Sequence, residues 1–476
     1  MGSVTSAILS GASALRSFQY ALNVTQNNID NASTPGYAAQ QVSLEASPFD
    51  PATGLGGGVS DGSLVDTRDL LAESDVWQQA GLQGEASAQS NALADIQNAL
   101  PVGSGAGIPD ALNGFFSNVS AWSAAPASPG AMQNVMLSAG ALAQTFQTTA
   151  ANVAGASATM TLSINDTVAQ INRLTAQIAA TNHAIQDGGA GDQGLQAQLY
   201  SSLETLSGLV NISALQVPEG GVNVTLSNGD ALVMGGQQFA LSTGNAPPPA
   251  ASADPQAPPD INVYGADGSV VNGQISSGTL AGLLQVRNVT IPGLIGNASQ
   301  PGALNTLAST LADAVNSIVG AGFVSQGPPP VPAPAGLFTY DQNSASAAAS
   351  TLAVDPDMNA TQLPAIDAAG IANGVPLDIM ALANLNDAAL GSNFTTFYGN
   401  AAAQVGSLLN TAQTNQATTA QTLAQAQSMR QSASGVSLDT EAANVLQFQA
   451  GYQAVAKMLS TLATLTQSLI DIIPSA

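Results

Sequence analysis

Two stretches at opposite ends of the chain carry apolar side chains at alternating steps of three and four residues, and no other feature constrains the fold as strongly. A helix with one apolar seam of this spacing is typical of a coiled coil. Such a helix is marginal alone in water, because nucleation is costly and the seam is exposed. We therefore predict that the two terminal helices pair. The seam residues are Val4, Ile8, Leu15, Phe18, Leu22 and Ile29 in the first helix and Val445, Phe448, Tyr452, Val455, Leu459, Leu462 and Leu469 in the last.

Gly11 interrupts the N-terminal seam. It contributes no side chain there, and its helix propensity is about 1 kcal/mol below that of alanine. A glycine at such a position also permits a neighbouring helix to approach closely. The sequence leaves both interpretations open.

A turn signal ends the first predicted helix, in the stretch NIDNASTPGYAAQQ at 28–41. Pro35 presets φ for the second position of a turn, and Gly36 accepts the positive φ of a type II turn at the third. Asn28 and Asn31 favour side-chain bonds to nearby backbone over a helix interior. A stop of this kind fixes the direction in which the chain leaves the helix.

The composition predicts a folded protein with mostly neutral surfaces. Of 476 residues, 45% are hydrophobic but only 8% are charged, against the usual quarter. Such surfaces suit packing against copies of the same chain. The net charge of −24 sets 30 acidic residues against Lys457 and five arginines, which argues against nucleic-acid binding. A basic membrane-surface helix is not supported, and no run of about 18 apolar residues predicts a membrane span.

The N-terminus lacks the basic segment and the continuous apolar segment of a secretory signal peptide. The chain contains no cysteine, so it is indifferent to the redox state of its compartment. If the protein is exported, we expect a route that needs no cleaved signal.

Between its ends the chain is predicted to be mainly helical with a small inserted β-rich part. Alternating patterns around Asn228-Gly229 and Asp267-Gly268 predict two hairpins, separated by a Pro/Ala-rich segment at 245–260. A second such segment spans 326–336. Helices are predicted over 69–100, 115–122, 131–187, 193–210, 279–321 and 392–432. The expected domains are a terminal coiled coil (1–40 and 435–476), a helical bundle (41–210 and 288–434) and a small β-hairpin-rich domain (211–287).

The residues predict no catalytic, cofactor or metal site. His183 is the single histidine, which excludes zinc motifs with two histidines. It lies beside the apolar stripe of a predicted helix and is interpreted as structural or exposed. Lys457 lies within the C-terminal helix without a partner motif. We therefore predict that the protein is not an enzyme.

The turn at residues 28–37 resembles the motif shared by bacterial flagellar rod, hook and hook-associated proteins, in which it links the terminal helix to the next domain. The matching linker residues are Asn28, Ile29, Asn31, Thr34, Pro35, Gly36 and Tyr37. The C-terminal run from Ser434 to Ile472, which contains Glu441-Ala442-Ala443-Asn444 near its start, is similar to the end of the hook-associated protein 1 (FlgK) family. The stretch SGTLAGLLQVRN at 277–288 resembles that family's central region.

This resemblance implies a secreted structural subunit of the bacterial flagellum that forms a ring at the hook–filament junction. It implies self-association, contacts with the hook protein and with a second junction protein of the hook-associated protein 3 type, and export by the flagellar type III system. It also implies that the C-terminal seam binds an export chaperone before assembly. No cofactor, nucleic acid or membrane is implied.

Two alternatives remain open from the sequence. One is another axial protein, of hook or rod, which shares the N-terminal turn; the run at 441–444 argues against it. The other is a secreted adhesin that uses the same export route. It requires a larger outer domain than residues 210–290 provide.

Overall fold

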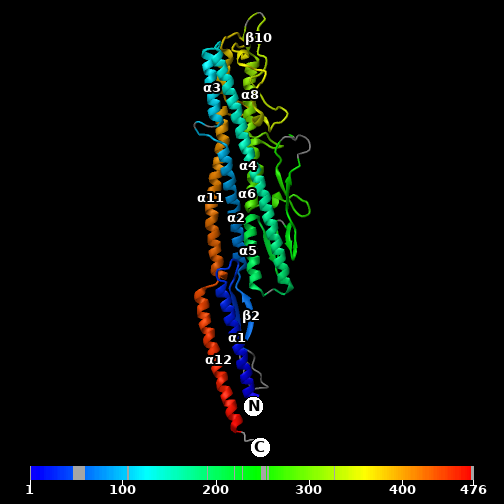
Figure 1. The fold of residues 1–476 in the computed structure, drawn as a ribbon, viewed down its shortest axis with the longest axis vertical. Helices are drawn as coiled ribbons and strands as arrows, with labels where there is room; N and C mark the ends of the chain where they lie inside the picture. The colour runs from blue at the N-terminus through cyan, green and yellow to red at the C-terminus, as the bar shows by residue number, and fades with distance from the viewer. Residues whose placement is uncertain are drawn as a thin grey trace.

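The protein forms a long rod built mainly of helices, as a computed structural model shows (Figure 1). Helices far apart in the sequence lie side by side along the rod, and both termini lie at the same end. The predicted mainly helical class with a β-rich insertion is confirmed. The structure describes residues 2–46, 59–103, 105, 107–189, 191–218, 220–227, 229–247, 254, 257–325, 327 and 329–472.

The terminal helices pair, as the seams predict. Helix α1 (Gly2–Asp30) packs against α12 (Leu438–Ile472) at the lower end of the rod (Figure 1). A Cβ atom on Gly11 would lie 2.7 Å from Leu459 Cδ2, and one on Gly451 would lie 2.8 Å from the Phe18 ring. Each glycine therefore accepts a large side chain from the other helix. Of the two interpretations of Gly11, close approach is confirmed.

A hairpin that the sequence did not reveal lies beside α1. Strand β1 (Gln40–Ala46) pairs antiparallel with β2 (Val59–Asp66), with a bulge between Val42 and Leu44. Both strands pack against α1, and the Ser13 hydroxyl donates to the Val59 carbonyl at 3.4 Å. The hairpin thus thickens the lower end of the rod on the side of α1.

Capping side chains fix where three long helices of the bundle begin. Asp69 accepts from the backbone N–H groups of the first turn of the second helix, Ser128 caps the fourth, and Asn393 caps the eleventh. The bounds agree with the predicted ranges to within two or three residues, except that the third helix is longer. They are α2 (Leu70–Ala99), α3 (Ile108–Ala124), α4 (Pro129–Ala184) and α11 (Phe394–Ser434).

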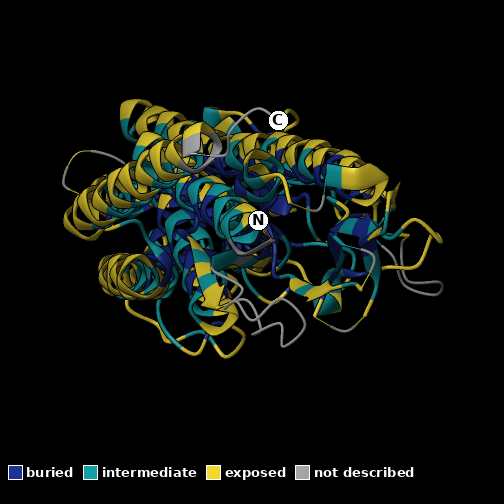
Figure 2. Ribbon diagram, turned by 90° about the horizontal axis from the view of Figure 1, so that it is seen from below, coloured by how far each residue is buried: buried dark blue, intermediate teal, exposed yellow. Residues whose placement is uncertain are grey.

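Two hydrophobic clusters fill the rod above the terminal pair. The upper one gathers Phe115, Trp122 and Phe146 with parts of α8 (Ala303–Gly320), α10 (Gly374–Leu382) and α11. The lower one gathers Ile164 and Ile171 with α5 (Gln193–Leu209), α6 (Thr279–Gln285) and the β-rich part. Seen from the end that carries the termini, exposed residues cover the outer faces of the helices and buried residues lie between them (Figure 2).

The β-rich part follows α5 and packs along α4. In the first predicted hairpin the Leu226 N–H donates to the Asp230 carbonyl at 2.8 Å, while Asn228 lies outside the described residues. The Asp267-Gly268 turn forms, but the strand before it pairs mainly across the Pro/Ala-rich segment, which corrects the prediction. The elements are α5 (Gln193–Leu209), β3 (Ser213–Gln216), β4 (Val222–Thr225), β5 (Ala231–Met234), β6 (Gln237–Gln238), β7 (Ser242–Asn245) and β8 (Ile261–Tyr264).

Residues 279–321 are mainly helical, as predicted, but they form several segments because the helix is irregular at Pro292 and breaks between residues 296 and 302. Pro292 has no N–H for the Asn288 carbonyl, and the turn before it widens so that the Ile291 N–H bonds to the Val286 carbonyl. Gly296 and Gly302 then take positive φ values of 82° and 79°. The segments are α6 (Thr279–Gln285), the π-helical η3 (Val286–Thr290), α7 (Ile291–Ile295) and α8 (Ala303–Gly320).

Short elements at the upper end complete the structure. They connect α8 to α11 and carry the second Pro-rich segment, near β10 at the tip (Figure 1). None of the described helices is long and apolar enough to span a membrane. The remaining elements are η1 (Ile185–Gly189), η2 (Asn272–Gln274), β9 (Phe323–Ser325), β10 (Val331–Pro332), β11 (Phe338–Thr339), α9 (Ala348–Thr351), β12 (Ala353–Val354), η4 (Ala360–Gln362) and α10 (Gly374–Leu382).

The buried Tyr398 predicts a loss of stability at high pH. Burial raises the pKa of Tyr398 to about 12, whereas an unfolded tyrosine ionises near pH 10, so unfolding releases a proton between these values. The free energy of unfolding must therefore fall as the pH rises from 10 toward 12.

Tyr398→Phe should reduce this loss of unfolding free energy by about 2–3 kcal/mol, measured by urea unfolding at pH 8, 10, 11 and 12. At neutral pH the variant should lose about 1 kcal/mol, because the Pro101 carbonyl loses its donor. Identical pH profiles in both proteins would contradict this account.

Candidate functional site at the base of the bundle

The two terminal motifs meet at one buried side chain. Asn28, which is 1% exposed, donates from Nδ2 to Glu441 Oε1 and to the Gln40 carbonyl, both at 2.9 Å. Its Oδ1 accepts from the Tyr37 hydroxyl at 2.9 Å and from the Gln40 N–H at 3.0 Å. A single amide thus connects the end of α1, the turn, the start of β1 and the first turn of α12.

The charge of Glu441 suits its position. It lies in the first turn of α12, where the helix dipole favours a carboxylate, and it is only 6% exposed. Burial, followed by the negative charges of Glu441 and Asp66, raises the pKa of Tyr37 to about 12. The phenol therefore remains protonated at neutral pH and donates to Asn28.

The predicted turn forms as expected. The Tyr37 N–H donates to the Thr34 carbonyl at 3.2 Å, and Gly36 has a φ of 75°, which fits the third position of a type II turn. Asn31 links the helix end to the turn, because it donates to the Asn27 carbonyl at 3.0 Å and accepts from the Thr34 hydroxyl at 3.2 Å. Pro35 is exposed at the turn's outer side.

The turn lies directly on α5. A Cβ atom on Gly36 would lie 2.3 Å from the Ala197 carbonyl oxygen and 2.9 Å from the Ser201 nitrogen. The Gly36 carbonyl accepts from Arg68 Nη2 at 2.8 Å. The glycine is therefore needed both for its positive φ and for this contact with a helix some 160 residues later.

A cluster of ion pairs lies beside the turn. The carboxylate of Glu73, which is 1% exposed, accepts hydrogen bonds from Arg68 Nη1 at 2.7 Å and from Arg430 Nη1 at 3.2 Å. Arg430 also pairs with Glu204 at 2.7 Å, and the Arg68 guanidinium lies 3.7 Å from the Tyr200 ring centroid. Burial lowers the pKa of Arg430, but the bonds to Glu204 and Glu73 raise it by more. The cluster joins the segment after β2 to α2, α5 and α11.

Sequence reasoning missed this cluster. Its arginines lie 362 residues apart, and no motif surrounds either of them. The sequence did offer one indication of their importance, because they are two of only six basic residues in the chain.

The link between α11 and α12 is held at Ser434. Its carbonyl accepts from the Ala39 N–H at 2.9 Å, and its hydroxyl accepts from the Asp69 N–H at 2.9 Å. The Thr67 hydroxyl donates to the Ala39 carbonyl at 2.8 Å. The turn after α1, the segment after β2 and the link before α12 are therefore bonded to one another at this level.

The predicted seam residues lie mainly between the paired helices. All six in α1 are half-buried, as are five of the seven in α12, while Tyr452 is 37% exposed. The side chain of Leu469 lies outside the described residues. Part of the apolar surface of the pair stays uncovered. The exposed large side chains of this pair are Leu9 (64%), Tyr20 (37%), Leu438 (56%), Leu446 (69%), Tyr452 (37%), Met458 (46%) and Leu465 (54%).

The titratable residues considered from the sequence lie away from this junction. His183 is exposed on α4 and pairs with Asp187, Nδ1 to Oδ2, at 2.8 Å. Lys457 is exposed on α12. In the part of the chain that the structure describes, no group of three or more His, Cys, Asp or Glu is placed to hold a metal ion.

Models of three flagellar protein families match the chain. The model of the flagellar hook-associated protein FlgK helical domain matches residues 93–330, half of the chain. The model of the flagellar basal body rod FlgEFG protein C-terminal matches 427–472, and that of the flagella basal body rod protein matches 8–37. The terminal helices are thus similar to those of rod proteins, whereas the middle is similar to the hook-associated protein.

The chain is similar to proteins called flagellar hook-associated protein 1 in several bacteria. Flagellar hook-associated protein 1 of Escherichia coli (strain K12) is 26% identical over 98% of this chain and 100% of the relative. That of Bacillus subtilis (strain 168) is 28% identical over 44% of this chain, and the match spans 43% of the relative. The solved structure of the flagellar hook junction protein FlgK from Burkholderia pseudomallei aligns at a TM-score of 0.47 and 24% identity, over 56% of this chain and 46% of that chain.

Gly36→Ala tests whether the turn must lie on α5. The substitution should destabilise the folded chain by more than about 3 kcal/mol, because a positive φ alone costs about 1–2 kcal/mol and the new Cβ atom collides with α5. The matched control is Gly268→Ala, since Gly268 also has positive φ but no heavy atom within 4 Å of such a Cβ atom. Its cost should be the strain alone. Equal losses in urea unfolding would show that contact with α5 contributes nothing.

Proposed function

This chain belongs to the FlgK family of flagellar hook-associated proteins, and from that premise we propose that it is a structural subunit of the junction between hook and filament. In this proposal copies of the chain form a ring on the distal end of the hook. The ring contacts the hook protein below and a second junction protein, of the hook-associated protein 3 type, above. The subunit reaches this place through the flagellar type III export channel.

The observation that carries the proposal is the buried bond between Asn28 and Glu441. It joins the two terminal helices where they meet the bundle, in a helix pair that still exposes large apolar side chains. An exposed apolar surface of this kind on the terminal helix pair favours association with other chains over a free monomer. We propose that the same seam occupies the groove of an export chaperone before assembly, in the manner of an amphipathic helix in a groove.

The first experiment is electron microscopy of cells that lack this protein, with the medium blotted for the filament subunit. The proposal predicts complete hooks without filaments and filament subunit released into the medium. Missing hooks would place the protein lower on the axis, as a hook or rod protein, a possibility favoured by the rod-protein models that match its termini. Normal filaments would contradict any axial role and favour a secreted adhesin.

Leu459→Asp tests the seam itself. Leu459 lies against Gly11, so the substitution places an unpaired carboxylate between the two helices, which costs about 3 kcal/mol or more when it is buried. We expect the variant to be produced but absent from isolated flagella, with motility in soft agar lost.

The matched control is Leu71→Asp, because Leu71 is 81% exposed at the start of α2, outside the terminal pair. It should assemble and support motility. Normal incorporation of the Leu459 variant, measured by immunoblot of isolated flagella, would mean that the seam is assigned wrongly.

A further inference from the structure

Charge is absent from long stretches of two bundle helices. Helix α11 has no charged residue from Phe394 to Met429, and α4 has none from Pro129 to Asn165. Many of these positions are exposed and carry Ala, Gly, Ser, Thr, Asn or Gln. The outward face of a helix in a soluble protein ordinarily carries charges. In a chain with 30 acidic residues, copies can meet at these two faces without direct repulsion.

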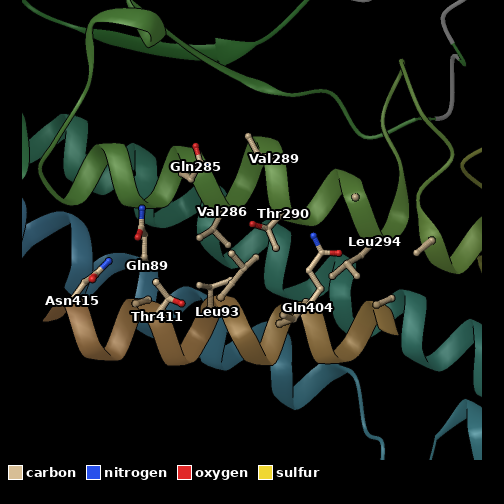
Figure 3. Close-up of a pocket in the computed structure, with 16 residues that line it drawn as sticks. Gln89, Leu93, Gln285, Val286, Val289, Thr290, Leu294, Gln404, Thr411 and Asn415 are labelled. Atoms are coloured by element: carbon tan, nitrogen blue, oxygen red, sulfur yellow. The ribbon is translucent and has the colours of Figure 1, made fainter. Parts of the chain in front are cut away.

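One of these faces contains a groove of about 390 Å³, between α11 on one side and η3 with α7 on the other (Figure 3). Leu93 of α2 and Val286 of η3 point into it, and none of its lining residues is charged. Its rims expose two large apolar side chains, Val289 at 55% and Leu408 at 41%. The groove is thus uncharged, is lined by both apolar and amide or hydroxyl side chains, and is open to the outside.

The irregular backbone opposite α11 is a consequence of Pro292. The π-helical turn η3 precedes this proline and carries Val289 outward at the rim. Turns of this kind are rare in helices and occur often at functional sites. The groove therefore lies where a proline interrupts the α-helical hydrogen bonding of the chain opposite α11.

A protruding leucine on α4 lies at the same height along the rod. Leu162 is 65% exposed, and its neighbour Thr161 accepts through Oγ1 from Arg287 Nε at 3.1 Å. Arg287 in turn follows Val286 of the groove. Helix α4 packs against α2, α6, η3 and α7, whereas α11 packs against α2, α3 and α8. The leucine and the α11 rim of the groove therefore belong to different helices.

We propose that the groove binds a second copy of this chain, whose Leu162 and surrounding uncharged face of α4 enter it between Leu408 and Val289. This proposal rests on the proposed ring. Copies related by rotation alone lie at equal heights, and a contact between two different faces closes such a ring. Leu162 and the groove lie at the same height and on different elements, as a contact within such a ring requires. A contact between neutral faces also lets chains of net charge −24 lie side by side with their acidic residues elsewhere.

Disulfide cross-linking tests the contact directly, because the chain has no cysteine of its own. Cells lacking the native chain produce two full-length versions with different tags, one with Leu162→Cys and one with Leu408→Cys. Their flagella are isolated and oxidised, and the dimer that carries both tags is measured. Such a bond requires Cα atoms within about 7 Å. We expect at least tenfold more mixed dimer than in the control pair.

The control replaces Leu162→Cys by Leu137→Cys. Leu137 is 63% exposed on the uncharged part of α4, so it matches in residue type, exposure and helix. It differs in height by about 37 Å at 1.5 Å per residue. Val289→Cys, on the opposite rim, is the second partner for Leu162→Cys and should give the same mixed dimer.

The outcomes separate this contact from the proposed ring. Mixed dimers in both Leu162 pairs and not in the control support it. Dimers formed only between two Leu408→Cys chains would overturn it, since α11 would then face α11. If no dimers form in flagella whose filaments are normal, the contact is wrong and the ring still stands. The same conclusion follows if another flagellar protein or a small apolar ligand fills the groove. If filaments form without this protein, it is the ring that fails.

Discussion

The hydrogen bond between Asn28 and Glu441 joins residues 413 positions apart, and the rest of the structure depends on it. Both side chains are buried, so each needs the other's polar atoms. Leaving either one unpaired costs about 1–3 kcal/mol, and more for the carboxylate. This bond fixes the register in which α1 and α12 pair. It also sets the point from which α11, α2 and β1 leave the terminal pair.

Above that bond, three of the six basic residues lie at joints between parts of the chain. Arg68 and Arg430 share Glu73 where the terminal pair meets the bundle. Arg287, which is 5% exposed, holds the Pro259 carbonyl against α4. Long stretches of α4 and α11 carry no charge at all. A chain with so few basic residues thus uses half of them to connect its parts.

Local patterns in the sequence predicted the parts of this structure that depend on neighbouring residues. The seams, the turn at Thr34-Pro35-Gly36-Tyr37 and the capped helices α2, α4 and α11 are of this kind. Hairpin β1–β2 escaped prediction because its strands are separated by residues 47–58 and not by a two-residue turn such as Asn-Gly. The contact of Gly36 with Ala197 and the ion pairs of Glu73 could not be predicted, since periodicity carries no information on which distant elements meet. The family-specific match also falls at 93–330, whereas the C-terminal run was expected to discriminate among axial proteins.

The most direct test of this account is an electron cryomicroscopy reconstruction of the boundary between hook and filament in isolated flagella. The account predicts a ring of rods at that boundary, with the α1–α12 pair lining the channel and the bundle outside it. The turn at Gly36 should lie between the inner and outer layers. A boundary without such rods, or one in which the bundle lines the channel, would contradict it.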